Sequence, residues 1–121
     1  MPTFLHFCDD PTIAIFMRHL VRDLTQDVYR FETINTAHPE TAIAAYTSTE
    51  AIGIVVVESP RDIAAVIQQL RAHPQLNDAN VMIITGRPQL YQSLASAKVA
   101  IGDKLDRIPM LRTLLSERAA I

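Results

Sequence analysis

The sequence predicts one α/β domain built around a doubly wound parallel sheet of five strands. Short apolar segments alternate along the chain with segments whose apolar residues recur at helical spacing, which is typical of βα units. Ile54–Val57 and Val81–Ile84 are apolar at every position, as expected for strands buried on both faces of a parallel sheet. With 121 residues, 49% of them hydrophobic, the chain is long and apolar enough for one domain over residues 1–121.

The N-terminal half predicts two βα units. Thr3–Cys8 is the first strand, and Asp10 caps a helix that begins at Pro11. Val28–Ile34 is the second strand, and Pro39 opens a short, alanine-rich helix that ends near Tyr46. The apolar stripe of the first helix consists of Ile13, Phe16, Met17, Leu20, Val21 and Leu24.

The third βα unit is centred on the segment 52–58, a buried strand that ends in a carboxylate at Glu58. The sequence Ser59–Asp62 resembles a capping box with aspartate in place of glutamate, so we expect a helix directly after it. The apolar positions of this helix are Ile63, Val66, Ile67 and Leu70.

The C-terminal part predicts two further units. Val81–Ile84 is the fourth strand, and a helix follows Pro88. Lys98–Ile101 is the fifth strand, and the last helix begins near Asp106. We expect the helix after Pro88 to turn Leu90, Tyr91, Leu94 and Ala97 inward, and the last helix to bury Ile108, Leu111, Leu114 and Leu115.

Composition excludes several functional classes. Eleven basic against thirteen acidic residues leave no basic excess for a nucleic-acid backbone, so no direct nucleic-acid binding is expected. The chain has neither a long apolar run nor a basic signal-peptide start, and we expect a cytoplasmic protein without membrane attachment. Its single cysteine, Cys8, fits a buried apolar position in a reducing compartment, and its four histidines have no metal-ligand spacing.

Polar residues follow four of the predicted strands, and in a parallel sheet these strand ends share one edge. They are the pair Asp9-Asp10, then Glu58, Thr85 and Lys104. Three carboxylates at one edge repel one another unless a cation or an amine offsets their charge. Lys104 can supply the amine, and carboxylate oxygens also suit Mg²⁺, with Asp9 and Asp10 as its candidate ligands.

These residues resemble the pattern of the response-regulator receiver domain, the flavodoxin-like switch module of two-component signalling and phosphorelays. The acidic pair after the first strand matches Asp9-Asp10, the hydroxyl residue before a small one matches Thr85-Gly86, and the lysine after the fifth strand matches Lys104. The resemblance implies that the pair helps to bind Mg²⁺, while Thr85 and Lys104 contact a phosphoryl group carried by an aspartate. It also implies a histidine kinase, an effector or another signalling protein as partner.

The chain departs from the receiver pattern at three positions. Glu58 is the carboxylate nearest to the acceptor position, only Ser59 separates it from Pro60, and an alignment without gaps places a valine there. Leucine replaces the proline that follows the lysine in the family, so the usual cis peptide is not expected. Ile101 replaces the aromatic switch residue and lacks a hydrogen-bonding tip.

Two signalling hypotheses follow from this pattern. In the first, the chain is a stand-alone pseudo-receiver that is not an enzyme: Glu58 takes the acceptor position, a Glu58–Lys104 pair holds the conformation, and output is through protein binding. In the second, it is a working phosphoacceptor that uses Mg²⁺ and an aspartate of the acidic pair or an unconventional site. A flavodoxin-like ligand-binding protein or enzyme is a third reading, against which the lack of a glycine-rich loop argues.

Structural roles compete with each functional assignment. Asp10 can serve only as a helix cap, Thr85 can satisfy loop backbone, Lys104 can be solvated, and His6 fits a structural position beside Cys8. The resemblance implies a contact face on the fifth strand and the last two helices, which also suits a homodimer. This face includes Tyr91, Lys98, Ile101, Arg107 and Arg112.

Overall fold

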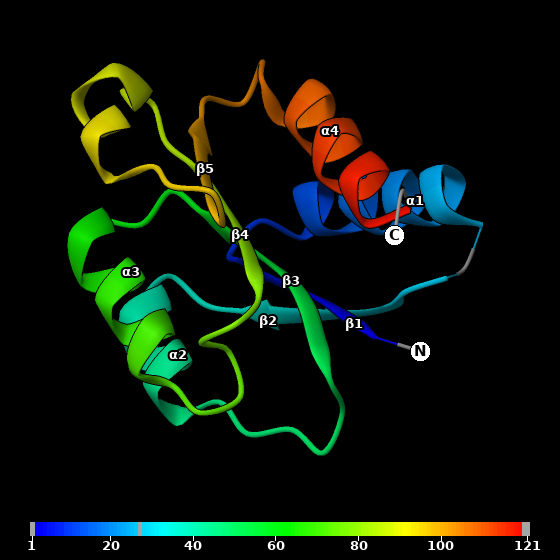
Figure 1. Ribbon diagram of the computed structural model, residues 1–121, viewed down its shortest axis with the longest axis horizontal. Helices are drawn as coiled ribbons and strands as arrows, with labels where there is room; N and C mark the ends of the chain where they lie inside the picture. The colour runs from blue at the N-terminus through cyan, green and yellow to red at the C-terminus, as the bar shows by residue number, and fades with distance from the viewer. Residues whose placement is uncertain (1, 27, 120–121) are drawn as a thin grey trace.

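One parallel sheet is formed by β1 (Thr3–Cys8), β2 (Arg30–Asn35), β3 (Ile52–Glu58), β4 (Asn80–Ile84) and β5 (Val99–Gly102). The computed structural model describes residues 2–26 and 28–119, with side chains as far as residue 115. All neighbouring strands run parallel, in the order β2-β1-β3-β4-β5 (Figure 1). The predicted flavodoxin-like, doubly wound sheet is therefore confirmed.

Helices cover both faces of the sheet. One face carries α1 (Pro11–Thr25) and α4 (Arg107–Ala119), and the other carries α2 (Pro39–Ala45) and α3 (Ile63–Ala72) (Figure 1). Because side chains alternate along a strand, each strand contributes to two apolar cores. Leu5 and Phe7 pack on the α2–α3 side, whereas Phe4 packs with Met17 on the α1–α4 side.

The starts of α1 and α3 show how capping residues determine where helices begin. Asp10 caps α1 as predicted, because its Oδ1 accepts hydrogen bonds from Thr12 N–H at 2.9 Å and from Ile13 N–H at 3.4 Å. The predicted capping box of α3 is wrong at its first position. Helix α3 begins at Ile63, directly after Ser59–Asp62 as predicted, but Asp62 and not Ser59 caps it, by accepting from Ala65 N–H at 3.0 Å.

The predicted helix after Pro88 is absent. Two short 3₁₀ turns, η1 (Pro88–Leu90) and η2 (Gln92–Leu94), connect β4 to β5 instead. Leu90 is 61% exposed and Leu94 is 36% exposed, so the expectation that both point inward is also wrong. Polar groups of this segment bond to the edge of β5, and these bonds replace those of a regular helix.

Smaller differences concern where elements begin and end. β2 begins at Arg30, not at Val28, whose side chain is 58% exposed, and β5 is shifted by one residue toward the C-terminus. The last helix begins at Arg107, next to the predicted start at Asp106. Its leucines Leu111, Leu114 and Leu115 are buried as expected, while Ile108 is half-buried.

Candidate functional site

A pocket of about 500 Å³ lies at the carboxyl edge of the sheet, between the segments that follow β1, β3, β4 and β5. This is the edge at which doubly wound sheets bind ligands. The structure brings together at this pocket all five strand-end residues singled out by the sequence, namely Asp9, Asp10, Glu58, Thr85 and Lys104. Ile101, the sixth candidate, is 7% exposed and belongs to the core on the α2–α3 side, so little of its side chain is accessible to a partner.

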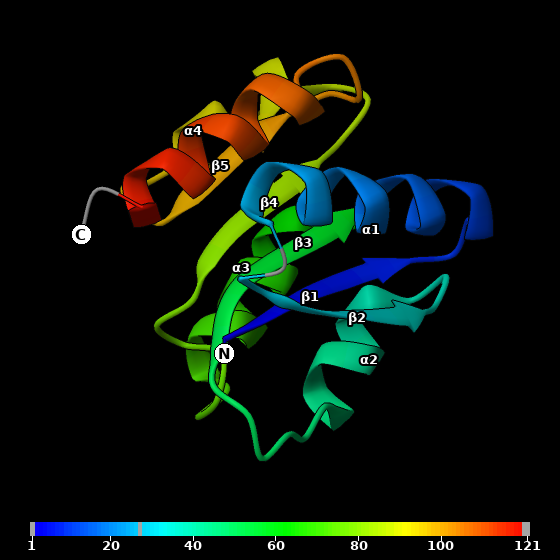
Figure 2. The same cartoon turned by 90° about the vertical axis from the view of Figure 1, so that its right-hand side faces the viewer.

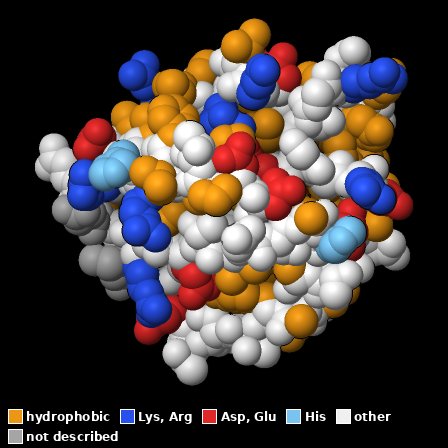
Figure 3. All heavy atoms as spheres, turned by 180° about the vertical axis from the view of Figure 1, so that it is seen from behind, with side chains coloured by type: hydrophobic (Ala, Val, Ile, Leu, Met, Phe, Trp, Pro, Cys, Tyr) orange, Lys and Arg blue, Asp and Glu red, His pale blue; other side chains and the backbone are white. Residues whose placement is uncertain are grey.

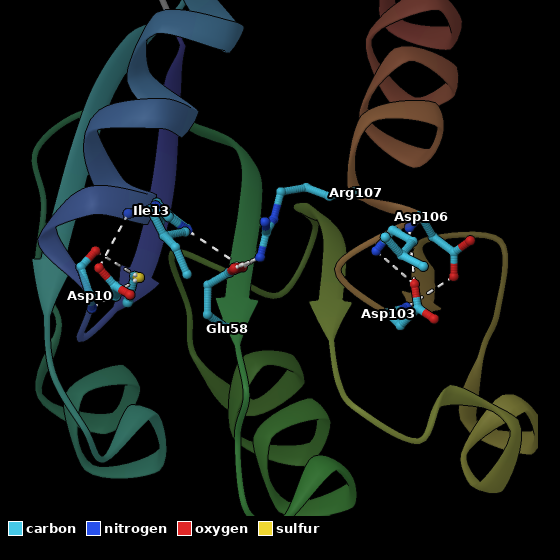
Figure 4. Close-up of polar contacts among 9 residues, drawn as sticks. Asp10, Ile13, Glu58, Asp103, Asp106 and Arg107 are labelled. Atoms are coloured by element: carbon cyan, nitrogen blue, oxygen red, sulfur yellow. Dashed lines mark hydrogen bonds and ion pairs between the residues drawn. The ribbon is translucent and has the colours of Figure 1, made fainter.

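Glu58 is the most buried acid of this pocket, and its partner is not the one expected. Its residue exposure is 8%, and its carboxylate meets the guanidinium of Arg107, the first residue of α4 (Figure 4). Nη2 of Arg107 bonds to Oε1 and lies 3.2 Å from Oε2. The expected Glu58–Lys104 pair is therefore wrong: within residues 2–26 and 28–119, the exposed Lys104 makes no ion pair.

The loop between β5 and α4 explains why arginine and not lysine reaches Glu58. Asp103 Oδ1 accepts hydrogen bonds from the backbone N–H groups of Leu105 at 2.8 Å and of Asp106 at 3.1 Å. Asp106 Oδ2 in turn accepts from Asp103 N–H at 3.0 Å. These bonds form a tight turn that leaves Lys104 exposed and starts α4 with Arg107 directed across the sheet edge toward β3 (Figure 4).

The backbone after Glu58 takes an uncommon conformation. Ser59 has a φ of 50°, in the left-handed region, which costs a residue with a Cβ some energy. Its N–H donates to the carbonyl of Ile84 at 2.8 Å and so continues the ladder between β3 and β4. The chain therefore turns sharply directly after the carboxylate.

A buried histidine completes the cluster. His6 on β1 is 0% exposed, and its Nε2 lies 3.7 Å from Oε2 of Glu58. Neither ring nitrogen has a hydrogen-bond partner among the described residues, and the ring packs against Phe31 with centroids 6.0 Å apart. His6 is thus buried beside the cluster, and its imidazole faces Glu58.

The acidic pair does not provide a metal site with Glu58. Asp9 is exposed, whereas the carboxylate of Asp10 is engaged by the first turn of α1. The charge of Glu58 is balanced by Arg107. In the part of the chain that the structure describes, no three His, Cys, Asp or Glu side chains are grouped to hold a metal ion, so these residues do not fit the Mg²⁺ site that the resemblance implies.

Two further pocket residues have structural partners. Thr85 Oγ1 accepts a hydrogen bond from Arg87 N–H at 3.4 Å, which is the loop-stabilising role considered for it. Cys8 is 3% exposed, and its Sγ lies 3.4 Å from both the N and the O of Asp10. Burial raises the pKa of the Cys8 thiol, and the negative charges of Glu58 and Asp9 act in the same direction.

Sequence reasoning assigned Arg107 to a partner-binding face and missed its role in the pocket. One signal was present: three carboxylates at one sheet edge require positive charge, and Arg107 follows the fifth strand almost as closely as Lys104 does. The receiver pattern directed attention to the lysine. Only the turn between β5 and α4 decides which of the two cations faces inward.

Charge on the outer surface is mixed. On the face drawn in Figure 3, acidic and basic side chains lie among one another and among apolar ones. The formal net charge of −2 agrees with this distribution. No helix within the described ranges is both long and apolar enough to cross a membrane.

Comparison with known proteins assigns no family. The sequence matches no protein-family model and no curated protein. What the protein does must therefore be inferred from the geometry of the pocket and from the resemblance of its strand-end residues to receiver domains.

Proposed function

We propose that this protein is a receiver-like signalling domain that does not transfer phosphoryl groups and acts by binding another protein. One observation carries the proposal: the carboxylate nearest to the acceptor position, Glu58, is buried and held by Arg107. The fold and the convergence of the strand-end residues at one pocket support the receiver-like part of the proposal.

The Glu58–Arg107 pair is unsuited to phosphoryl acceptance. A carboxylate that accepts a phosphoryl group needs a free oxygen in line with the donor. A cation must also lie near the transferred group, where it stabilises the negative charge of the transition state. Here both Oε atoms of Glu58 lie within 3.2 Å of Nη2 of Arg107. Breaking this pair would leave a buried charge without compensation, which is energetically costly.

The same pair is suited to hold one conformation. It links the end of β3 to the start of α4, two segments that are 49 positions apart in sequence. In receivers the corresponding edge changes when the acceptor is phosphorylated, and we infer that Arg107 keeps it in a single state here. A partner, such as a histidine kinase or an effector protein, would then bind a constant surface.

A second candidate function is a phosphorylation-competent receiver. Its support is Asp9, an exposed residue that lines the same pocket as Thr85 and Lys104. Its carboxylate makes no hydrogen bond or ion pair with another described residue. Asp9 would accept the phosphoryl group, and Lys104 would neutralise part of its charge.

Intact-mass measurement separates these two functions. The protein is incubated with acetyl phosphate and Mg²⁺ beside an authentic receiver domain, which verifies the donor. We expect the receiver to gain one phosphoryl group and this protein to gain none. A stoichiometric gain would overturn the proposal, and its loss in Asp9→Asn but not in Glu58→Gln would establish the second candidate.

A further inference from the structure

The two edges of the sheet differ in how their backbone groups are satisfied. At β5, both N–H and C=O of Val99 bond to Ser96, at 3.2 and 3.0 Å, and the carbonyl of Ile101 accepts from Nε2 of Gln92 at 3.0 Å. The opposite edge is β2, whose one neighbour in the sheet is β1 (Figure 2). Within the described residues, the edge of β5 is therefore covered by its own chain, whereas no further strand pairs with the outer edge of β2.

The hydrogen bonds to β1 show which groups of β2 face outward. Arg30 N–H donates to Pro2 and Thr36 N–H donates to Cys8, so the even-numbered residues between them face β1. Because backbone direction alternates along a strand, N–H and C=O of Phe31 and Thr33 point away from the sheet. Among the described residues, no hydrogen bond from outside the β1–β2 ladder reaches these groups.

Space is also available beside this edge. A pocket of about 300 Å³ lies between α1 and β2 and is lined by Arg18, Thr33 and Asn35, among others. Thr33 Oγ1 is buried there without a hydrogen-bond partner among the described residues. The helix therefore leaves space unfilled beside this part of β2.

Residues 28–34 of one copy suit antiparallel pairing with residues 28–34 of a second copy. Paired antiparallel about Phe31, it places Val28 opposite Ile34, Tyr29 opposite Thr33, and Arg30 opposite Glu32. Each pair joins side chains that favour one another across strands: two β-branched residues, an aromatic and a β-branched residue, and opposite charges. Arg30 and Glu32 lie together on the α2–α3 side, with Phe31 on the other side.

We propose that β2 pairs with β2 of a second copy of this chain, antiparallel and with the two-fold axis at Phe31. The outward N–H and C=O groups of Phe31 and Thr33 then join a continuous sheet across both copies. This homodimer interface differs from the face on β5 and the last helices that the receiver resemblance implies. It does not depend on whether the protein accepts phosphoryl groups.

Charge selects this register over its neighbours. A shift of the two-fold axis to Arg30 places the two Arg30 side chains opposite each other, and a shift to Glu32 does the same with the two glutamates. Like charges directly opposite one another destabilise a strand pair, so only the Phe31-centred register gains from both charges. Arg30 and Glu32 remain available, because their contacts with Glu50 at 3.5 Å and with Tyr46 Oη at 2.8 Å occupy one atom of each.

The pairing also accounts for a difference between sequence and structure. The β pattern spans Val28–Ile34, yet β2 of the single chain begins at Arg30 and leaves Val28 58% exposed. In the dimer Val28 lies across from Ile34 of the partner, and we expect the strand to extend to it. A strand pair of this length lies at the small end of interface sizes, so the dimer is expected to be weak.

Sedimentation equilibrium from about 10 μM to 1 mM tests the proposal, a range suited to weak association. We expect a monomer–dimer equilibrium that Arg30→Glu or Glu32→Arg alone weakens by about tenfold or more, since each creates two like-charge pairs. The double variant Arg30→Glu/Glu32→Arg restores opposite charges, and its dimerisation should return to within about threefold of the wild type. Arg61→Glu is the control, because it changes the net charge by the same amount as Arg30→Glu but lies in an exposed loop. It should leave dimerisation unchanged.

Amide hydrogen exchange at both ends of this concentration range locates the interface. Phe31 and Thr33 should be better protected at the high concentration, whereas amides of β5 should not change. A monomer at every concentration, a dimer that either single charge reversal leaves intact, or added protection at β5 and α4 instead would each overturn the proposal.

Discussion

At the level of single residues, the pocket is organised by the charge of Glu58. Its side chain is 5% exposed and that of Arg107 is 12% exposed, so neither ion is well solvated. Removing two ions from water carries a large desolvation penalty. The mutual attraction of Glu58 and Arg107 offsets this penalty, so the buried pair is tolerated. The pair therefore contributes little net stability, yet loss of one partner is expensive.

A double-mutant cycle tests this account. Arg107→Met leaves Glu58 buried without a cation, and we expect it to lower the free energy of unfolding by about 3 kcal/mol or more. In a Glu58→Gln background, where no charge remains to be compensated, the same substitution should cost at least about 1 kcal/mol less. Urea unfolding measures both.

Lys104→Met is the matched control for this cycle. It removes an exposed lysine from the same pocket, and its effect on stability should lie within about 0.5 kcal/mol. An equal loss in the Lys104 and Arg107 variants would contradict the assignment of Arg107 as the partner of Glu58.

At the level of elements, the start of α4 packs closely against the end of β5. A Cβ added to Gly102 would overlap Sδ of Met110 and would lie 2.9 Å from Cβ of Asp106. This close contact positions the first turn of α4, and with it Arg107, over the sheet edge. Gly102 is thus required by space and not by backbone conformation, since no glycine in the described residues has a positive φ.

Replacing Gly86 and Gly102 by alanine separates the cost of a steric clash from the general effect of a glycine-to-alanine change. Gly102→Ala forces α4 to shift, and we expect a loss of about 1–3 kcal/mol in thermal or urea unfolding. Gly86→Ala is the control, because nothing lies within 4 Å of the added Cβ, and it should change stability by less than about 0.5 kcal/mol. Equal effects of the two would show that α4 is free to move away from β5.

At the level of the whole molecule, two cores on opposite faces of the sheet determine stability, and the charge cluster borders the one on the α1–α4 side. Cys8 lies at the end of β1, where it is buried and also lines the pocket wall. Burial raises the pKa of its thiol above the ordinary value of 9.0. The folded state therefore favours the neutral thiol more strongly than the unfolded chain does.

This preference predicts a loss of stability in alkaline solution. Below pH 9.0 the thiol is neutral in both states, and its contribution is fully present. As the pH rises past that value the unfolded chain releases the proton first, so the free energy of unfolding falls until the folded thiol ionises as well. Urea unfolding at about pH 8 and pH 10 should show a steeper loss for the wild type than for Cys8→Ala.

The variant also separates the contribution of Cys8 from that of Tyr46, whose pKa is shifted as well. Burial also raises the pKa of Tyr46 above 10.0, and the hydrogen bond to Glu32 adds to the effect. Tyr46 is present in both proteins, so its contribution cancels in the comparison. Parallel pH dependences would contradict the account given for Cys8.

Much of the fold could be predicted from local patterns. Ile54–Val57 and Val81–Ile84 are apolar throughout because both faces of their strands are buried, and Asp10 caps α1 because a carboxylate can satisfy free N–H groups there. The segment after Pro88 failed as a helix because its polar groups bond to β5, which no local pattern reveals.

The sequence by itself determined the five strands and the four α-helices that alternate with them, and it placed five polar residues at one sheet edge, because strand ends and periodicity are local properties. Tertiary structure alone decided which cation meets Glu58. Arg107 lies 49 positions away, and its approach depends on the Asp103–Asp106 turn and on the packing of α4 against Gly102. Electrostatic partners depend on distances in space, and those distances exist only once the chain has folded.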